Sequence, residues 1–352
     1  MEKRIAIVAV GAVGGHVGGY LSRAGYDVTL IDPWPAHVEE MKANGITLTG
    51  VSEPECFTTP VRALHLTEVE CLSRERPIDI AFVCTKSYDT EWATMLIRPH
   101  LAPDGFVVSL QNGINEDRVA SVVGWGKTVG CIASLIAVEL HAPGQVRRNV
   151  PLGGEEHIVF RVGEAHGRIT PRIEAVAEML GTADSAKTTA NLWGERWSKL
   201  VANSTRNGLY SVTAQAGGDI DRHDSARHLA IRLAGEAVLV GLAQGYVLEE
   251  IYHIEPELLA AAGRGDEAAY GKLDALLLER ARKSNSAATH RPSMAQDVAK
   301  GRRTEIEFLN GLVCERGAEL GVPTPANATM VELVKQVERG TLTPGLEAIE
   351  GV

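Results

Sequence analysis

Residues 5–15 decide the fold: they have the sequence IAIVAVGAVGG, an apolar run that passes directly into a glycine-rich turn. A continuous apolar run of this length predicts a strand buried on both faces of a parallel sheet. Residues 16–23 predict a helix that ends near Gly25, and residues 27–31 (DVTLI) predict a second strand that ends at Asp32. A strand, a glycine turn, a helix and a second strand in this order predict a nucleotide-binding unit.

The glycine turn departs from the usual G-x-G-x-x-G pattern at one position. Ala9 stands where the first glycine normally permits a tight turn, whereas Gly11 and Gly14 keep the other two places, with Ala12 and Val13 between them. Gly11 allows the backbone to approach a pyrophosphate, Gly14 allows close packing of helix on strand, and the helix N-terminus offers free N–H groups. We expect residues 11–14 to bind a dinucleotide. The alternatives are glycines that serve packing alone, or a methyltransferase, which uses a similar unit.

The acidic residue at the end of the second strand predicts the kind of dinucleotide. Asp32 lies 21 residues after Gly11. A carboxylate at this place accepts hydrogen bonds from a ribose 2′-hydroxyl and repels a 2′-phosphate. The sequence therefore favours NAD over NADP.

The composition is that of a globular chain with no general affinity for nucleic acid. The 352 residues suffice for two domains, 45% are hydrophobic and 23% charged, and the net charge of -10 repels phosphate backbones. No uninterrupted apolar stretch reaches the roughly 18 residues that a membrane span needs. Lys3 and Arg4 before the apolar run imitate a signal peptide, but the glycine turn and helix that follow favour a strand. We expect neither nucleic-acid nor membrane partners.

The cysteines indicate a reducing compartment. There are five, an odd number, and none forms a C-x-x-C pair. This pattern argues against a disulfide framework and against a cysteine-rich zinc site. We expect no metal, reduced thiols and a cytoplasmic location.

The order of elements predicts an α/β fold, with an N-terminal Rossmann-type parallel sheet followed by a mostly α-helical C-terminal domain. Strands are expected at residues 78–84 and 106–110, a helix at 36–44, and short strands with turns over 136–162. After residue 171 the pattern is helical, and we place a dinucleotide-binding domain at 1–170 and a helical substrate-binding, catalytic domain at 171–352. The predicted helices of the second domain cover 172–180, 192–214, 224–245, 266–283 and 294–319. Residues 260–290 are rich in small and charged residues and suggest a mobile excursion over the site; the role of 246–290 stays open.

One predicted helix carries a polar stripe. In residues 192–214, Lys199, Asn203 and Asn207 are spaced i, i+4, i+8 and therefore lie along one side of the helix, beside an apolar stripe that includes Trp197. An ammonium and two amides in one row suit a binding or catalytic surface. A solvated lysine with two amides that cap or contact other helices is the alternative, and the spacing alone does not decide between them.

A second polar run begins at Arg291, where Pro292 suits the start of a helix. Asp297 and Glu305 are eight residues apart, so on a continuous helix they differ by roughly 80° and share a broad side. The alternative is that both carboxylates form salt bridges with neighbouring arginines such as Arg302.

Taken together, these blocks resemble the ketopantoate reductases (2-dehydropantoate 2-reductases), and the resemblance covers nearly the whole chain. Their order and spacing are more specific than any single block. The blocks are the turn at Gly11 and Gly14, Thr85-Lys86-Ser87, Gln111-Asn112-Gly113, Trp197-Ser198-Lys199-Leu200 with Asn203 and Asn207, Pro292-Ser293-Met294 with Gln296-Asp297, and Thr304-Glu305-Ile306 with Asn310-Gly311.

The resemblance implies a role for each matching residue. Lys199 would be the general acid for carbonyl reduction, and Glu305 would position substrate and lysine. Lys86 would lie near the cofactor. The residues expected to bind substrate or cofactor are Asn112, Asn203, Asn207 and Ser293. The chemistry agrees, because hydride addition to a ketone builds negative charge on oxygen that an ammonium stabilises and protonates.

The departures from the family pattern concern cofactor and substrate. Ala9 replaces a glycine, and Asp32 favours NAD where pantothenate-pathway members typically use NADP. Arg206 and the pair His290-Arg291 add cationic or titratable groups that suit a different acid. We predict a nicotinamide-linked enzyme that interconverts a 2-oxo acid and its 2-hydroxy acid, with ketopantoate as the named substrate and a homodimer as its assembly. The alternatives are an NAD-dependent dehydrogenase of another hydroxy acid or secondary alcohol, and a non-catalytic NAD sensor.

Overall fold

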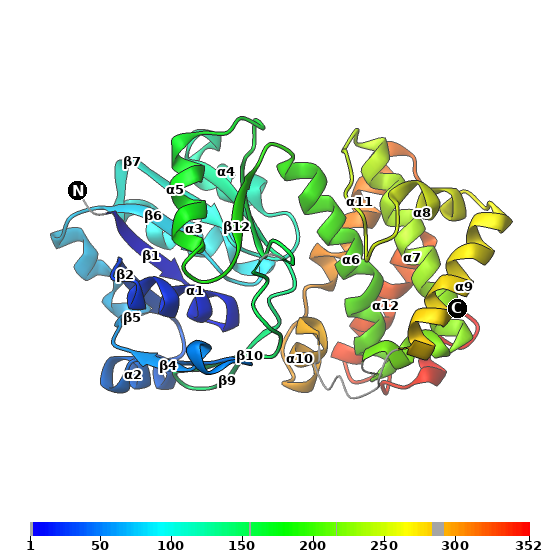
Figure 1. Ribbon diagram of the computed structural model, residues 1–352, viewed down its shortest axis with the longest axis horizontal. Helices are drawn as coiled ribbons and strands as arrows, with labels where there is room; N and C mark the ends of the chain where they lie inside the picture. Colours follow the sequence, from blue (N-terminus) through cyan, green and yellow to red (C-terminus); the bar gives the residue numbers. More distant parts are fainter. Residues whose placement is uncertain (1–2, 155, 216, 284–291) are drawn as a thin grey trace. The chain divides into compact units, whose positions relative to one another are not determined.

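The computed structural model describes residues 3–154, 156–215, 217–283 and 292–352. It divides into two compact units, Met1–Leu192 and Trp193–Val352 (Figure 1). The first unit is built around sheets and the second around helices, which confirms the expected fold class. No helix among the described residues is both long enough and apolar enough to span a membrane.

An eight-stranded sheet forms the centre of the first unit. Its strand order is β12-β11-β8-β7-β6-β1-β2-β5, and every neighbouring pair is parallel except β8 with β11. The predicted parallel sheet is thus confirmed. The strands are β1 (Arg4–Val8), β2 (Asp27–Asp32), β5 (Arg62–His65), β6 (Ile78–Val83), β7 (Leu101–Ser109), β8 (Thr128–Ala133), β11 (Phe160–Glu164) and β12 (Ala186–Thr189).

Both faces of this sheet are buried, as the apolar run at residues 5–10 predicts. Along β1, Ile5 and Ile7 belong to one hydrophobic core cluster, whereas Ala6 and Val8 belong to another. This alternation shows the two faces of a pleated strand each covered by apolar side chains. The helices of the unit are α1 (Ala12–Arg23), α2 (Pro35–Asn44), α3 (Thr90–Ile97), α4 (Glu116–Val123) and α5 (Pro171–Leu180).

Helix α1 begins at Ala12, four residues earlier than the prediction of a helix from His16. Gly11 is its N-cap residue, so Ala12, Val13 and Gly14 form the first helical turn instead of a longer loop. The turn between β1 and α1 is therefore only three residues long. The free N–H groups at the start of the helix follow this turn directly, at the position where cofactor phosphates are expected.

A second, four-stranded sheet has the order β4-β3-β10-β9. Its strands are β3 (Ile46–Thr49), β4 (Phe57–Thr59), β9 (Val138–Ala142) and β10 (Gln145–Arg148). The short strands expected within 136–162 are present. Arg148 in β10 is buried and forms an ion pair with the equally buried Asp184 at 2.5 Å, so this arginine is structural.

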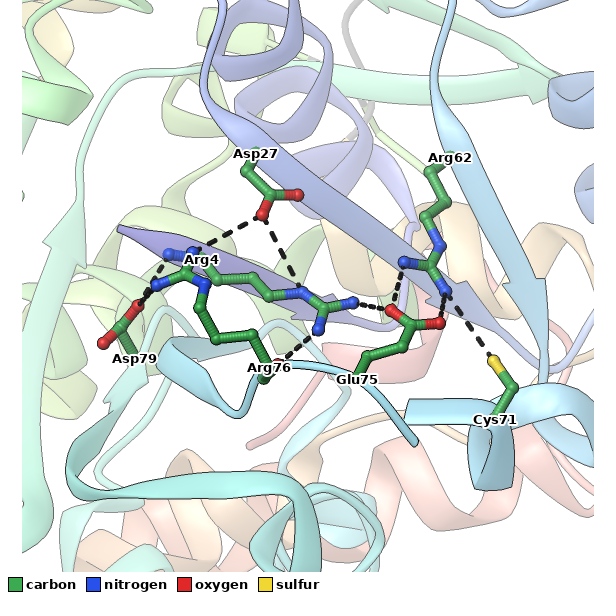
Figure 2. A network of polar contacts seen from close by, with 7 residues as sticks. All are labelled: Arg4, Asp27, Arg62, Cys71, Glu75, Arg76 and Asp79. Atoms are coloured by element: carbon green, nitrogen blue, oxygen red, sulfur yellow. Dashed lines mark hydrogen bonds and ion pairs between the residues drawn. The ribbon is translucent and has the colours of Figure 1, made fainter. Parts of the chain in front are cut away.

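A charged network joins the amino-terminal ends of neighbouring strands of the eight-stranded sheet (Figure 2). Arg4, at the start of β1, is almost fully buried and donates to the Glu75 carboxylate and to the carbonyl of Arg76. Arg62, in β5, donates to both Glu75 oxygens at 2.7 Å. The bonds from Arg62 and then Arg4 lower the pKa of Glu75 to about 2. The network lies at the sheet end opposite the glycine turn.

The predicted boundary at residue 170 differs from the division at Leu192. Strand β12 pairs in parallel with β11 from Phe160 to Gly163, so the chain completes the first unit's sheet before it enters the helical unit. The helix predicted at 172–180 is α5, which packs on the first unit's core through Ile173 and Val176.

The second unit confirms the predicted helices at 192–214, 224–245 and 266–283. Its helices are α6 (Leu192–Thr213), α7 (Asp224–Ala243), α8 (Pro256–Gly263), α9 (Glu267–Lys283), α10 (Ser293–Ala299), α11 (Asn310–Leu320) and α12 (Pro325–Glu338). The expected mobility of the excursion at 260–290 is wrong for residues 260–283, because α8 and α9 are packed helices with Leu259 and Leu273 buried. Residues 284–290 lie outside the described residues.

The single helix predicted over 294–319 is also wrong. Helix α10 ends at Ala299, and Gly301 has φ +61°, a left-handed conformation that closes a helix. The Arg302 N–H donates to the Asp297 carbonyl at 2.9 Å and the Gly301 N–H to the Val298 carbonyl at 3.0 Å, which is a Schellman motif. Glu305 therefore does not share a helix side with Asp297; it precedes the short 3₁₀ helix η7 (Ile306–Phe308).

Candidate functional site

The turn after β1 has the backbone conformation of a dinucleotide-binding turn, although alanine replaces its first glycine. Ala9 has φ +70°, the left-handed region that glycine normally occupies. A Cβ on Gly14 would lie 2.3 Å from the Ala9 carbonyl oxygen, so only glycine fits there, whereas the space beside Gly11 is open for 4 Å. The geometry accounts for the turn at Ala9 and for the helix packing at Gly14, whereas the phosphate approach at Gly11 stays a prediction.

Asp32 holds this turn in place. One carboxylate oxygen accepts the Val10 N–H at 2.8 Å and the other accepts the Trp34 N–H at 2.9 Å. Burial raises the pKa of Asp32, and the two backbone bonds oppose that shift. Each oxygen retains acceptor capacity, since a carboxylate oxygen can accept two hydrogen bonds. Asp32, the residue expected to bind ribose, therefore also links the turn after β1 to the end of β2.

The side chain of His37, a residue that no sequence pattern singled out, contacts the backbone of the same turn. Its buried ring contacts the Val10 carbonyl through Nε2 at 2.8 Å, while Nδ1 accepts the Gly144 N–H at 2.8 Å. Because Nδ1 accepts, Nε2 is the nitrogen that donates to the Val10 carbonyl. No local pattern could reveal this role, because Gly144 is 107 residues away.

The loops after β6 and β7 are joined by amide side chains. Gln111 donates to the Thr85 carbonyl at 3.0 Å and to the Thr90 hydroxyl at 2.8 Å. Asn115 donates to the Asn112 carbonyl at 2.8 Å and to the Ser87 hydroxyl at 3.2 Å. These bonds fix the loop segments that carry two expected site residues, the half-buried Lys86 and Asn112. The positioning amides Gln111 and Asn115 were not predicted as functional.

In the second unit, helix α6 carries the predicted stripe of Lys199, Asn203 and Asn207. Trp197 is buried and its indole N–H donates to the Ala237 carbonyl of α7 at 2.8 Å, which anchors α6. Lys199 follows two residues later, roughly 200° around the helix from Trp197, and is half-buried. The Asn203 amide nitrogen is shielded from solvent, and among the described residues it has no hydrogen-bond partner.

The residues that follow Glu305 pack against α6. Ile306 is buried, and a Cβ on Gly208 of α6 would lie 3.5 Å from its Cδ1 atom. Asn310 donates to the Ser204 carbonyl of α6 at 2.8 Å. The buried Glu305 thus precedes a segment packed against α6 next to Asn207.

Three further predictions concerned Ser293, Arg206 and the pair His290-Arg291. Ser293 opens α10 and is half-buried. Arg206 is no free cation for an acidic substrate, because it forms two hydrogen bonds with the Asp221 carboxylate at 2.5 and 2.8 Å. His290 and Arg291 lie outside the described residues.

Comparison with known proteins gives matches along nearly the entire chain. Residues 5–159 match the family described as "Ketopantoate reductase PanE/ApbA", and residues 191–338 match its C-terminal part, "Ketopantoate reductase PanE/ApbA C terminal". A 2-dehydropantoate 2-reductase of Archaeoglobus fulgidus is 30% identical over 342 residues, 96% of this chain and 99% of the relative. The corresponding protein of Pyrococcus horikoshii is 28% identical, over 95% of this chain and 97% of the relative.

Solved structures of related proteins have a similar fold. A PanE/ApbA family ketopantoate reductase from Ralstonia eutropha JMP134 has a TM-score of 0.76 and 28% identity, over 96% of this chain and 99% of that one. A D-mandelate dehydrogenase solved with NADH and anilino(oxo)acetate has the same TM-score with 23% identity, over 96% of this chain and 99% of that one. The second likeness shows the fold alone.

Proposed function

This chain belongs to the ketopantoate reductase family, and we propose that it interconverts a 2-oxo acid and its 2-hydroxy acid, with ketopantoate and pantoate as the named pair. The observation that carries the proposal is the α6 stripe of Lys199, Asn203 and Asn207 in a chain that also has a dinucleotide turn at residues 9–14. A sensor of NAD would need the turn and not the stripe.

The residues of the turn fit a nicotinamide dinucleotide. The free N–H groups and the positive dipole end of the 12-residue helix α1 lie at its N-terminus, residues 11–13. The open space beside Gly11 would admit a pyrophosphate there. Ala12 and Val13 would contribute backbone N–H donors there, and Lys86 would add positive charge from the loop after β6. A nicotinamide cofactor held by these residues would supply the hydride in reduction or accept it in oxidation.

Lys199 would provide the proton. As the carbonyl carbon gains hydride, its oxygen gains negative charge, and the ammonium of Lys199 stabilises that charge and donates a proton to it. The carboxylate of Glu305 would hold the ammonium in position. Amides of Asn112, Asn203 and Asn207 and the hydroxyl of Ser293 would orient the substrate. In the oxidative direction, neutral Lys199 would accept the hydroxyl proton.

Asp32 supports NAD as the preferred cofactor. Both of its oxygens accept backbone N–H groups, the arrangement of an ionised carboxylate, and a negative charge there disfavours a 2′-phosphate. The same observation favours a second candidate function, an NAD-dependent dehydrogenase that oxidises another hydroxy acid in a catabolic pathway.

The proposal extends to assembly and location. We propose a homodimer, as the family resemblance implies, and a cytoplasmic protein, since all five cysteines are free thiols. Light scattering at micromolar concentration tests the dimer, and a monomer would contradict it.

A spectrophotometric screen tests the proposed reaction. The full chain would be mixed with NADH or NADPH and a panel of 2-oxo acids that includes ketopantoate, and with NAD or NADP and the matching 2-hydroxy acids. Absorbance change at the nicotinamide wavelength with any 2-oxo acid supports the proposal. Cofactor binding without turnover across the panel would contradict it.

A further inference from the structure

A chain of buried hydrogen bonds in the second unit joins four helices. It begins at Glu236 of α7, whose two carboxylate oxygens accept the N–H groups of Ala326 at 2.8 Å and Asn327 at 2.9 Å. These are the second and third residues of α12, so a carboxylate from a neighbouring helix caps its N-terminus. The Asn327 side-chain amide also donates to Glu236, at 2.8 Å. Glu236 therefore fixes both the backbone and the side chain of Asn327.

Asn310, the first residue of α11, continues the chain from α12 to α6. Its side-chain N–H groups donate to the Asn327 amide oxygen at 3.0 Å and to the Ser204 carbonyl of α6 at 2.8 Å. All three residues are fully buried. The Asn310 amide oxygen is also shielded from solvent, and it has no hydrogen-bond partner within the part of the chain that the structure describes. A leucine of similar volume would avoid the cost of this oxygen, so the two donated bonds are what the amide contributes.

The α6 end of the chain lies within the polar stripe of that helix. The Ser204 carbonyl belongs to the turn that starts at Asn203 and ends at Asn207. The next residue, Gly208, lies so close to α12 that a Cβ there would be 2.7 Å from the Met330 side chain. This part of α6 is therefore held against its neighbours at two successive points, by a hydrogen bond at Ser204 and by close packing at Gly208.

On its other side, Asn310 follows the segment that begins with Glu305. The N–H groups of Phe308 and Leu309 both donate to the Glu305 carbonyl, at 2.9 and 3.1 Å, which closes a compact turn immediately before Asn310. Glu305 itself is buried. Because only this turn separates the two residues, the bond from Asn310 to α6 also determines where the Glu305 backbone lies relative to the stripe.

We propose that Asn310 is a positioning residue: its amide sets the Glu305 segment against α6, and thereby places the Glu305 carboxylate that would hold the ammonium of Lys199. The inference rests on the proposed function and deepens it, since it names a residue through which the helical unit maintains that site. Glu236 and Asn327 orient the amide, because each group in a hydrogen-bonded chain restricts the next. Asn310 acts through Glu305 and contacts neither substrate nor cofactor in this role.

Steady-state kinetics of the full chain, with saturating NADH and the fastest 2-oxo acid of the panel, test this role. Asn310→Leu keeps the side-chain volume and removes both donated bonds. Its kcat should fall by about tenfold to a hundredfold, the effect of a small displacement of catalytic groups. KM for the 2-oxo acid and NADH affinity should stay within about threefold of wild type, because the displaced groups act in the transition state. Asn310→Ser keeps one donor hydroxyl and should lose less.

A double-mutant cycle with Glu305→Ala identifies the route of the effect. If Asn310 acts through Glu305, Asn310→Leu should lower kcat by less than about twofold in the Glu305→Ala background. Val313→Ala is the matched control, because Val313 lies on the same helix and is fully buried. That truncation should lower Tm by leaving a cavity and should keep kcat within about twofold of wild type.

The outcomes separate this inference from the function beneath it. A folded Asn310→Leu protein with near-normal kcat, or losses that multiply across the cycle, overturns the inference and leaves the 2-oxo acid reaction standing. Unfolding of both Asn310 variants, judged by circular dichroism, would assign the amide to stability alone and also overturn it. A wild-type protein that binds NADH but turns over no 2-oxo acid overturns the proposed function and the inference with it.

Discussion

Replacing Ala9 by glycine should stabilise the first unit. Ala9 has φ +70°, and a left-handed conformation costs an alanine roughly 1–2 kcal/mol relative to its preferred regions. Glycine removes that strain but adds freedom to the unfolded chain, which costs about 0.4–1 kcal/mol. The net change in the free energy of unfolding is a gain of about 0.5–1 kcal/mol. For a unit of 192 residues this corresponds to a Tm increase of about 1–4 °C.

The assay is thermal unfolding followed by calorimetry, with NADH affinity measured in parallel. Ala120→Gly is the matched control in the same unit, because Ala120 lies inside α4 with ordinary helical geometry. That substitution should lower stability by about 1 kcal/mol, the usual cost of glycine within a helix. NADH affinity of Ala9→Gly should stay within about twofold of wild type. If Ala9→Gly lowers Tm as the control does, the turn is not strained as described.

Two further substitutions test the cofactor unit. Asp32→Ala should raise kcat/KM with NADPH relative to NADH by about tenfold or more, because it removes a negative charge from the place of a 2′-phosphate; an unchanged ratio in cofactor-titration kinetics would contradict the NAD assignment. The buried His16 should make the first unit acid-sensitive, since burial lowers its pKa to about 3 and the unfolded chain takes up the proton first. Stability is therefore complete above about pH 6.5 and decreases toward pH 3, by at most about 1.4 kcal/mol per pH unit. His16→Gln should flatten this part of the Tm–pH curve, and a curve parallel to wild type would refute the assignment.

Long periodic segments could be predicted from the sequence, whereas helix ends and short strands, which depend on the conformation of a few residues, could not. Helix α6 was expected at 192–214 and covers Leu192–Thr213, because its apolar and polar stripes persist over 22 residues. The helix expected at 294–319 is interrupted because Gly301 adopts a left-handed conformation, and a glycine inside a periodic pattern does not reveal its φ angle. Strand β12 has only four residues and too little pattern to show that the sheet extends past residue 170.

The candidate site likewise has some features with a local sequence pattern and others that depend on tertiary contacts. The glycine turn, Asp32 and the α6 stripe are sequence-local patterns and could be found by spacing. His37 and Asn115 act through partners that only the tertiary structure brings near, so their positioning roles had no sequence signal. Arg206 suggested a free cation, and only the fold revealed its bond to Asp221.

The central claim is that Lys199 donates the proton, and steady-state kinetics of Lys199→Ala with separately measured NADH affinity test it most directly. We predict a kcat lower by about two to four orders of magnitude with NADH affinity nearly unchanged, as expected for a lost acid–base group. Glu305→Ala should reduce kcat less, and the two losses should not add, since the residues act as one unit. Lys187→Ala, at an exposed lysine of β12, is the control and should retain wild-type turnover. A near-normal kcat for Lys199→Ala would contradict the account, because a solvated surface lysine is dispensable for turnover.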